Sequence, residues 1–459
     1  MKRLTTVFTH ILFFALAAGG VTAQEATRST NFLAGLSAPL SLGEAINHAL
    51  ERNSTILKAQ SDLEATYGVV VQTRAIAIPK VKMTGEYQAT DATERFPLGN
   101  IQTQNDQNWS SNIRVVQSLY EGGRVRSALR TAKLTKEQGL LRYQSVVADT
   151  ILEVQIAYYD ILLAAQQITV QEASLGLLQK ELEDATRRFE AGTVPRFNVL
   201  RAEVEVANAR PRVIRARNSY RINKNNLAVL LGYDVPHDVW EDIPLQLSGV
   251  LAAEPYEIAI PVALGQALER RPELGALRKA EGLRRETVTN AKAGYKPSVQ
   301  LFAGYGDRVS TFSDDLTRDV PGWQAGALLS WDLFDGFLTK GKVQEARALH
   351  SRAQEDLADL TRRIELEVRT AYSNFIEARE VLESQKKVQE QGEEALRLAT
   401  SRSQAGTGTQ LDVLNAQTAL TEARTTQVQA LRDYSVARAK LERAIGAHLS
   451  QAPAPSQTP

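Results

Sequence analysis

Few residues in this chain are suited to catalysis or to metal binding. The sequence of 459 residues contains no cysteine and five histidines that lie far apart. Thiol nucleophiles, thiolate metal sites, disulfides and a lipid anchor on cysteine are therefore excluded. Lys and Arg (54) almost balance Asp and Glu (53), which argues against a nucleic-acid-binding surface. We expect no enzyme activity, no cofactor and no metal site.

One carboxylate nevertheless has a notable position. Asp412 follows residues 405–408 (Ala-Gly-Thr-Gly), a sequence that predicts a helix reversal because glycine commonly ends helices. Asp412 would then lie in the first turn of the returning helix, where the positive helix end stabilises a carboxylate. This stabilising role alone could explain the residue. A similar reversal at residues 191–193 (Ala-Gly-Thr) is followed by Asn198.

These two reversals belong to a tandem repeat. Residues 49–52 (Ala-Leu-Glu-Arg) recur identically at 267–270, 218 residues later, and residues 119–122 (Leu-Tyr-Glu-Gly) correspond to 333–336 (Leu-Phe-Asp-Gly), 214 residues later. The offset is 218 up to Tyr87, which corresponds to Tyr305, and 214 from Trp109, which corresponds to Trp323. The two repeats therefore differ in length at one place between Tyr87 and Trp109, as an exposed loop would tolerate. We therefore divide the chain into a first repeat (41–232), a connecting segment (233–260) and a second repeat (261–446).

Each repeat predicts a helix, two strands and a long helical hairpin. The first helix begins at Ser41, where Glu44 completes a capping box, and its counterpart begins near Pro261. The expected strands are 80–90, 109–119, 298–306 and 322–334, and the expected hairpin tips are 192–195 and 406–409. Apolar residues spaced by three and four along the hairpins indicate coiled-coil packing.

The four strands alternate between apolar and polar residues, which is typical of membrane strands and also of a half-buried soluble sheet. Aromatic residues at the loop ends of the strands favour the membrane interpretation, since such residues mark membrane interfaces; they are Tyr87, Trp109, Tyr305 and Trp323. Four strands cannot close on themselves, and open edges are not tolerated in lipid. Two, three or four copies would have to combine, and the residues alone do not choose among these numbers.

The termini have characters of their own. Residues 1–23 resemble a secretory signal peptide, with Lys2 and Arg3 before a short apolar stretch and a small-residue cleavage site at Val21-Thr22-Ala23. Residues 24–40 form an N-terminal extension. The tail 447–459, which contains several prolines, is expected to be disordered. We therefore expect an exported protein.

The whole pattern resembles the TolC family of outer-membrane efflux and secretion channels over residues 41–446. The match rests on the duplicated layout, on a proline before each first strand (Pro79 and Pro297), and on the tips followed by 198–200 (Asn-Val-Leu) and 411–414 (Leu-Asp-Val-Leu). The resemblance implies a mainly α-helical fold with a small membrane β portion: a homotrimer whose long helices form a coiled-coil barrel across the periplasm and whose strands share a twelve-stranded β-barrel. Its location would be the lipid of the Gram-negative outer membrane.

The resemblance also implies a function. The chain would be the outer-membrane component of a tripartite efflux or type I secretion system, a passive conduit for drugs, metals or proteins, gated at the helical tips. Its partners would be a periplasmic adaptor protein and an inner-membrane transporter. A secreted coiled-coil scaffold or adhesin without a pore is the alternative.

The resemblance further implies roles for residues at the tips. Asp412 would line the pore constriction, together with Asn415, where family members often have a second acid, and Asn198 in the first repeat. Because these two positions lack charge, we expect weak cation selectivity. Gly192, Thr193, Gly406 and Thr407 would contact the adaptor.

Overall fold

The computed structural model describes residues 39–89, 107–233, 243–309 and 319–447. The signal peptide predicted at 1–23, nearly all of the 24–40 extension and all but the first residue of the predicted tail lie outside the described residues, as do the loops between the paired strands of each repeat.

The two halves of the chain contain the same elements in the same order. The helices of the first half are α2 (Leu42–Arg52), α3 (Ser54–Arg74), α4 (Arg124–Glu190) and α5 (Arg196–Leu230). Those of the second half are α6 (Ile260–Arg270), α7 (Pro272–Lys292), α8 (Leu338–Gln404) and α9 (Gln410–Ala444). α4 and α8 both have 67 residues, and α5 and α9 both have 35. Every helix therefore has a repeat counterpart of equal length.

The first helix of each half is divided in two, which the sequence analysis did not predict. Asn53 ends α2 and caps α3, because its side-chain oxygen accepts hydrogen bonds from Thr55 N (2.8 Å) and Ile56 N (3.3 Å). In the second half, Arg271 occupies the same place, and Pro272 begins α7 at a position where its missing N–H is not needed. The capping box of Ser41 and Glu44 is present at the start of α2.

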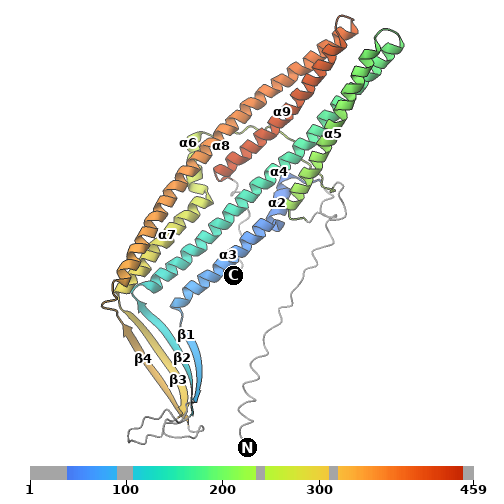
Figure 1. Cartoon of the computed structure of the whole chain (residues 1–459). Coiled ribbons are helices and arrows are strands. Elements are labelled where there is room, and N and C mark those ends of the chain that lie inside the picture. The colour runs from blue at the N-terminus through green and yellow to red at the C-terminus, as the bar shows by residue number, and fades with distance from the viewer. Residues whose placement is uncertain (1–38, 90–106, 234–242, 310–318, 448–459) are drawn as a thin grey trace, which may run out of the picture.

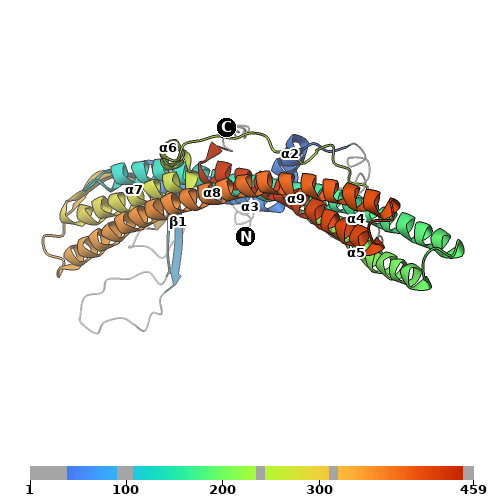
Figure 2. The same ribbon diagram turned by 90° about the horizontal axis from the view of Figure 1, so that it is seen from above.

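The long helices form one curved layer with the sheet at one end, and α2 and α6 lie on the convex face of this layer (Figures 1 and 2). α4 lies in the middle of this layer and packs against α3, α5, α7 and α9, whereas α8 packs against α7 and α9. Small and β-branched residues fill the seam between α4 and α5, including Ala202, Val206 and Ala209, all buried. The spacing by three and four predicted this seam correctly. One edge of the layer is formed by α3 and α5, and the other by α8.

The segment between the two halves packs across the helices. Leu245 and Leu251 are buried in a core cluster with Tyr158 of α4. The Tyr158 hydroxyl donates to Leu40 O (3.1 Å) and accepts from Gly249 N (3.1 Å). The connecting segment therefore covers part of α4 and contributes to its core.

The sheet is antiparallel in the order β1 (Lys80–Ala89), β2 (Gln107–Glu121), β3 (Ser298–Val309) and β4 (Asp319–Ser330). The prediction that the last strand reaches residue 334 is wrong, because β4 ends at Ser330. Its partner strand β3 begins at Ser298, which pairs with Ser330, so residues 331–334 have no partner strand in the described part of the chain. The outer edges of β1 and β4 have no strand partner within the described chain.

Candidate functional site

The two faces of the sheet differ sharply in polarity. Directly paired residues of antiparallel strands share a face, so the register assigns every side chain to one side. One face is mostly apolar and includes Val81, Met83, Ile113, Val115, Val299, Leu301, Ala303, Ala325, Ala327 and Leu329. The opposite face is mostly polar or glycine and includes Lys80, Lys82, Thr84, Glu86, Asn112, Arg114, Gln300, Arg308, Gln324 and Ser330. This arrangement suits a sheet with lipid on one side and water on the other.

The predicted interface aromatics lie on the apolar face. Tyr87 pairs directly with Trp109, and Tyr305 pairs with Trp323. All four are near the sheet end that points away from the helices, and Tyr87, Tyr305 and Trp323 are exposed in the single chain. Their contact with lipid headgroups stays a prediction. None of the helices in the described part of the chain combines the length and the apolar character of a membrane span.

Both hairpin tips lie at the end of the rod opposite the sheet (Figure 1) and have the same backbone geometry. At the first tip, Gly192 has φ 70°, and Thr193 N donates to Arg188 O (2.8 Å). At the second tip, Gly406 has φ 75° and Thr407 N donates to the carbonyl of Arg402 (3.0 Å). These are Schellman turns, in which glycine supplies the left-handed residue. The tip glycines and threonines are solvent-exposed or nearly so.

Asp412 lies fully exposed at the start of α9 and is held by a capping box. Its Oδ2 accepts hydrogen bonds from Thr409 N (3.0 Å) and Thr409 Oγ1 (2.8 Å). These bonds, first the one from the backbone N–H, lower the pKa of Asp412 below its usual value, so the carboxylate stays charged. Asn415, one turn further on, is also exposed.

The first tip has no equivalent of this box. Asn198 N donates to Pro195 O (3.0 Å), and Pro195 has neither an N–H nor a hydroxyl to offer in return. The charge at the tips therefore differs between the two repeats. A single chain contributes one Asp412 and cannot form a ring alone. That Asp412, Asn415 and Asn198 line a constriction therefore stays a prediction about the assembled protein.

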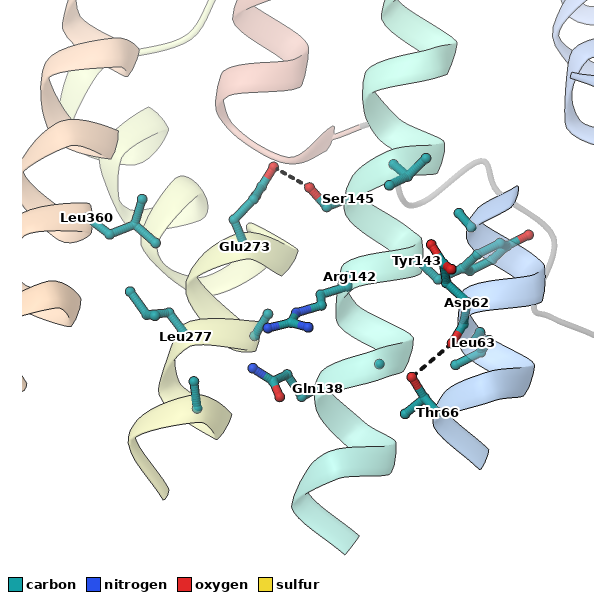
Figure 3. Close-up of a pocket in the computed structure, with 15 residues that line it drawn as sticks. Asp62, Leu63, Thr66, Gln138, Arg142, Tyr143, Ser145, Glu273, Leu277 and Leu360 are labelled. Atoms are coloured by element: carbon teal, nitrogen blue, oxygen red, sulfur yellow. Dashed lines mark hydrogen bonds between the residues drawn. The ribbon is translucent and has the colours of Figure 1, made fainter. Parts of the chain in front are cut away.

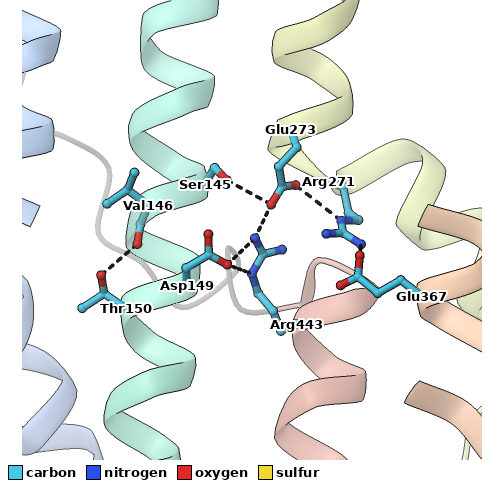
Figure 4. Close-up of polar contacts among 8 residues, drawn as sticks. All are labelled: Ser145, Val146, Asp149, Thr150, Arg271, Glu273, Glu367 and Arg443. Carbon is cyan, nitrogen blue, oxygen red and sulfur yellow. Dashed lines mark hydrogen bonds and ion pairs between the residues drawn. The ribbon is translucent and has the colours of Figure 1, made fainter. Parts of the chain in front are cut away.

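An ionic network built on two buried arginines joins the two halves of the chain (Figure 4). Arg443 of α9 is buried and pairs with Asp149 of α4 (Nε–Oδ1 2.8 Å) and with Glu273 of α7. Arg271, also buried, contacts Glu367 of α8 (2.6 Å). Although burial alone would raise the pKa of Glu273, its hydrogen bond and charge interaction with Arg443 hold that pKa at about 2.

This network was not predicted from the sequence. A comparison of the two repeats could have indicated it, because Arg271 and Arg443 correspond to the uncharged Asn53 and Val229 of the first half. Two arginines that appear in only one copy of a duplicated unit indicate a contact that only this copy makes within the chain.

A groove of about 760 Å³ runs between α3, α4 and α7 (Figure 3). Asp62 and Thr66 line it from α3, Arg142 extends from α4, and Leu277 lies on α7. Thr66 Oγ1 donates to the Asp62 carbonyl (2.9 Å), which is an ordinary bond within the helix. Within the described ranges, no group of three or more His, Asp or Glu side chains is arranged to hold a metal ion. The features that remain as candidate sites are the two-faced sheet and the hairpin tips.

Comparison with known proteins identifies the family. The model of the outer membrane efflux protein family matches residues 45–233 and 263–447. The outer membrane protein TolC of Escherichia coli (strain K12) is 22% identical over 421 residues, 90% of this chain and 83% of TolC. The alkaline protease secretion protein AprF of Pseudomonas aeruginosa is 26% identical over 410 residues, 88% of this chain and 83% of AprF. The crystal structure of the outer membrane protein VceC from Vibrio cholerae superposes with a TM-score of 0.73 at 20% identity, covering 88% of this chain and 96% of VceC.

The match to the family model includes both repeats and leaves out the connecting segment, in agreement with the duplication seen in the helices. The same fold is found in the VceC structure, and TolC is matched along most of its length. The chain therefore belongs to the outer membrane efflux protein family and is an outer-membrane channel of the efflux and secretion type.

Proposed function

We propose that the channel is a homotrimer, that it works with a periplasmic adaptor and an inner-membrane transporter, and that its tips close the entrance around Asp412. The observation that carries this proposal is a difference in burial between the two repeats. Counterpart residues on α5 and α9, related by an offset of 214, occupy the same places in helices of equal length but differ greatly in exposure.

One face of α9 is covered by α4 of the same chain. Val428 is 6% exposed, Val436 4% and Arg443 5%. The counterparts on α5 are Ile214 at 67%, Ile222 at 49% and Val229 at 60%. Large apolar side chains at this spacing form a stripe along a helix, and a stripe so exposed in water marks an interaction surface. We name Ile214, Ile222 and Val229 the α5 stripe.

The duplication indicates what covers the α5 stripe. In the second half, α9 lies against α4, whose repeat counterpart is α8. By the same geometry, α5 of one copy would lie against α8 of the next copy, since α8 forms the other edge of the helical layer. α8 carries exposed apolar residues of its own, including Leu366, Val381 and Val388. The copies would join edge to edge and close a ring.

Joining the helical edges also brings together the open sheet edges, β4 of one copy and β1 of the next. Closure removes the unpaired backbone groups that lipid does not tolerate. Three copies supply twelve strands, which exceeds the minimum of about eight for a closed membrane sheet. The number three comes from the resemblance to the TolC family, which implies a homotrimer, rather than from the contacts of one chain.

The roles of the tips follow from the same assembly. Three copies would place three Asp412 carboxylates around the narrow end, while the exposed turns at Gly192, Thr193, Gly406 and Thr407 would face the adaptor. The interface aromatics would contact outer-membrane lipid. The name of AprF refers to protease secretion, so proteins as well as small molecules are candidate cargo, and the transporter would choose between them.

Engineered disulfides test the proposed ring, because the chain has no cysteine of its own. Within the chain, Thr421 Oγ1 donates to Ser174 Oγ at 3.0 Å across the contact of α9 with α4. The repeat counterparts are Ala207 on α5 and Val388 on α8. We expect the double variant Ala207→Cys/Val388→Cys to form disulfides between copies, which would give a covalent trimer on non-reducing gels.

The matched control is the double variant Ser174→Cys/Thr421→Cys, whose disulfide lies within one chain and leaves the mass on the gel unchanged. A ladder that ends at the dimer, or beyond the trimer, would contradict the number three. If the control pair oxidises while Ala207→Cys/Val388→Cys remains monomeric, the proposed packing of α5 on α8 is wrong.

A further inference from the structure

The polar face of the sheet carries a concentration of positive charge at one level. Lys82 of β1 and Arg114 of β2 are direct partners in the antiparallel register. The row continues through Gly304 of β3 to Gln324 of β4. No acidic side chain therefore lies in this row of four partners. Two cations stand side by side with neutral neighbours.

Carboxylates on the same face are distant from this pair. Glu86 pairs with Ser110, four residues along β2 from Arg114, which corresponds to about 13 Å at a rise of about 3.3 Å per residue. Glu121 lies near the helical end of β2, where it accepts a hydrogen bond from Ser118 Oγ (2.6 Å). Arg308 and Lys80 add further positive charge to the described part of this face.

The arginine is held in place by a built contact. The Arg114 guanidinium carbon lies 4.4 Å from the centroid of the Phe302 ring, within the range of a cation–π interaction. Phe302 in turn lies over Gly326, where an added Cβ would meet the ring at 2.8 Å. Gly304, opposite Arg114, has no side chain to compete for the space. The position of the charge is therefore specified by three neighbouring residues.

Stability does not account for the pairing of Lys82 with Arg114. Like charges directly opposite each other on a sheet are destabilising. On the described part of this face, the nearest acid is four residues along the strand from the two cations. Two cations at one level are therefore an arrangement suited to an external anion. Rings of Lys and Arg side chains select for anions in pores.

We propose that Lys82 and Arg114 form a cationic ring inside the sheet-enclosed part of the channel, which binds polyvalent anions and favours the passage of anionic cargo at that end. The inference rests on the proposed trimer, in which three copies contribute six positive charges. The polar face must line the water-filled interior, since the apolar face is the one suited to lipid. The conduit would thus carry a carboxylate ring at the helical tips and a cationic ring in the membrane.

The test uses single trimers in a planar bilayer, with tripolyphosphate as the probe. Added to the chamber on the sheet side, opposite the helical rod, tripolyphosphate should reduce the current of the unmodified channel. The neutral double variant Lys82→Gln/Arg114→Gln should weaken this block. If the ring contributes a potential of about half kT, the block by an anion of about four charges weakens roughly sevenfold, and the chloride-to-potassium permeability ratio falls roughly threefold.

Two controls separate the charge from its structural role. The charge-conserving variant Lys82→Arg/Arg114→Lys should keep the block, because it keeps both cations at the same level. Arg352→Gln, which removes an exposed cation from α8 far from the sheet, should also keep it. The single variants Lys82→Gln and Arg114→Gln are measured as well, so that a folding failure of the double variant does not decide the outcome.

The outcomes distinguish the ring from the trimer. Absence of conducting trimers in the unmodified protein would overturn the proposed function, and the ring with it. Conducting trimers that tripolyphosphate does not block from the sheet side, or that it blocks equally in the neutral variants, would overturn the cationic ring and leave the trimer standing.

Discussion

The ionic network between the two halves allows a quantitative prediction for Glu273→Gln. This substitution keeps the shape of the side chain and removes the charge that pairs with Arg443. The pKa of Glu273 in the folded chain is about 2, against a usual value of 4.5. At about 1.4 kcal/mol per pH unit, the difference corresponds to roughly 3 kcal/mol per chain at neutral pH. This is an upper value, because glutamine keeps some hydrogen bonding.

The contribution depends on pH with a defined sign. A carboxylate whose pKa is lowered by folding stabilises the folded state fully above its unfolded pKa and loses this effect as pH falls towards its folded pKa. The advantage of the unmodified chain over Glu273→Gln is therefore complete at pH 7. It should decline between about pH 4.5 and pH 2, and by pH 3 less than half should remain.

The assay is the apparent melting temperature of the detergent-solubilised protein, followed by circular dichroism at a fixed scan rate. An unfolding entropy of about 2.1 cal/mol/K per residue over 459 residues gives about 1 kcal/mol/K. We therefore expect Glu273→Gln to melt about 3 °C lower at pH 7 and about 1 °C lower at pH 3. The control Glu51→Gln changes an exposed carboxylate at the end of α2 and should melt like the unmodified chain. Equal shifts at both pH values, or none at pH 7, would show that the charge of Glu273 does not stabilise the folded chain.

Two further predictions concern the tip and the packing of the hairpin ends. Asp412→Asn should lower the cation preference of the channel in planar bilayers. Thr409→Ala removes the hydroxyl of the capping box and should raise the pKa of Asp412, so that on acidification this variant loses its cation preference at a higher pH than the unmodified channel. Unchanged ion selectivity in both variants would show that Asp412 does not line the pore. Gly232→Ala should destabilise the protein by about 1–2 kcal/mol or more, because Gly232 has φ 78° and an added Cβ would meet the backbone carbonyl of Arg52. The control Gly265→Ala adds a Cβ in open space on α6 and should be neutral or stabilising in the same melting assay.

Periodic and local signals in the sequence predicted most of the fold. The alternation in the strands, the spacing of three and four in the hairpins and the capping box at Ser41 each depend on residues close together in the chain, and all three appear in the structure. The family and its channel function were also predicted correctly from the duplicated layout. The alternative of a secreted scaffold or adhesin without a pore is wrong, because the chain belongs to a family of outer-membrane efflux proteins.

What the sequence did not predict depends on contacts between distant residues. The break at Asn53 arises because its amide caps α3 and also donates to Leu230 O (2.7 Å), 177 residues away. The early end of β4 follows from the start of its partner strand, because Ser330 pairs with Ser298, the first residue of β3, which is distant in sequence. The network around Arg443 joins four helices, and no local sequence pattern predicts a contact between residues so far apart in the chain. The roles of Asp412, Asn415 and Asn198 stay predictions, because they depend on neighbouring copies.

The exposed α5 stripe has a consequence for the degradation of newly made copies before they assemble. A single chain displays Ile214, Ile222 and Val229 to water together with the apolar face of its sheet. In the proposed trimer both surfaces would be covered only after assembly, so a single copy would stay exposed longest when few other copies are present. We therefore expect quality-control proteases to cleave single copies most readily when the concentration of the protein is low.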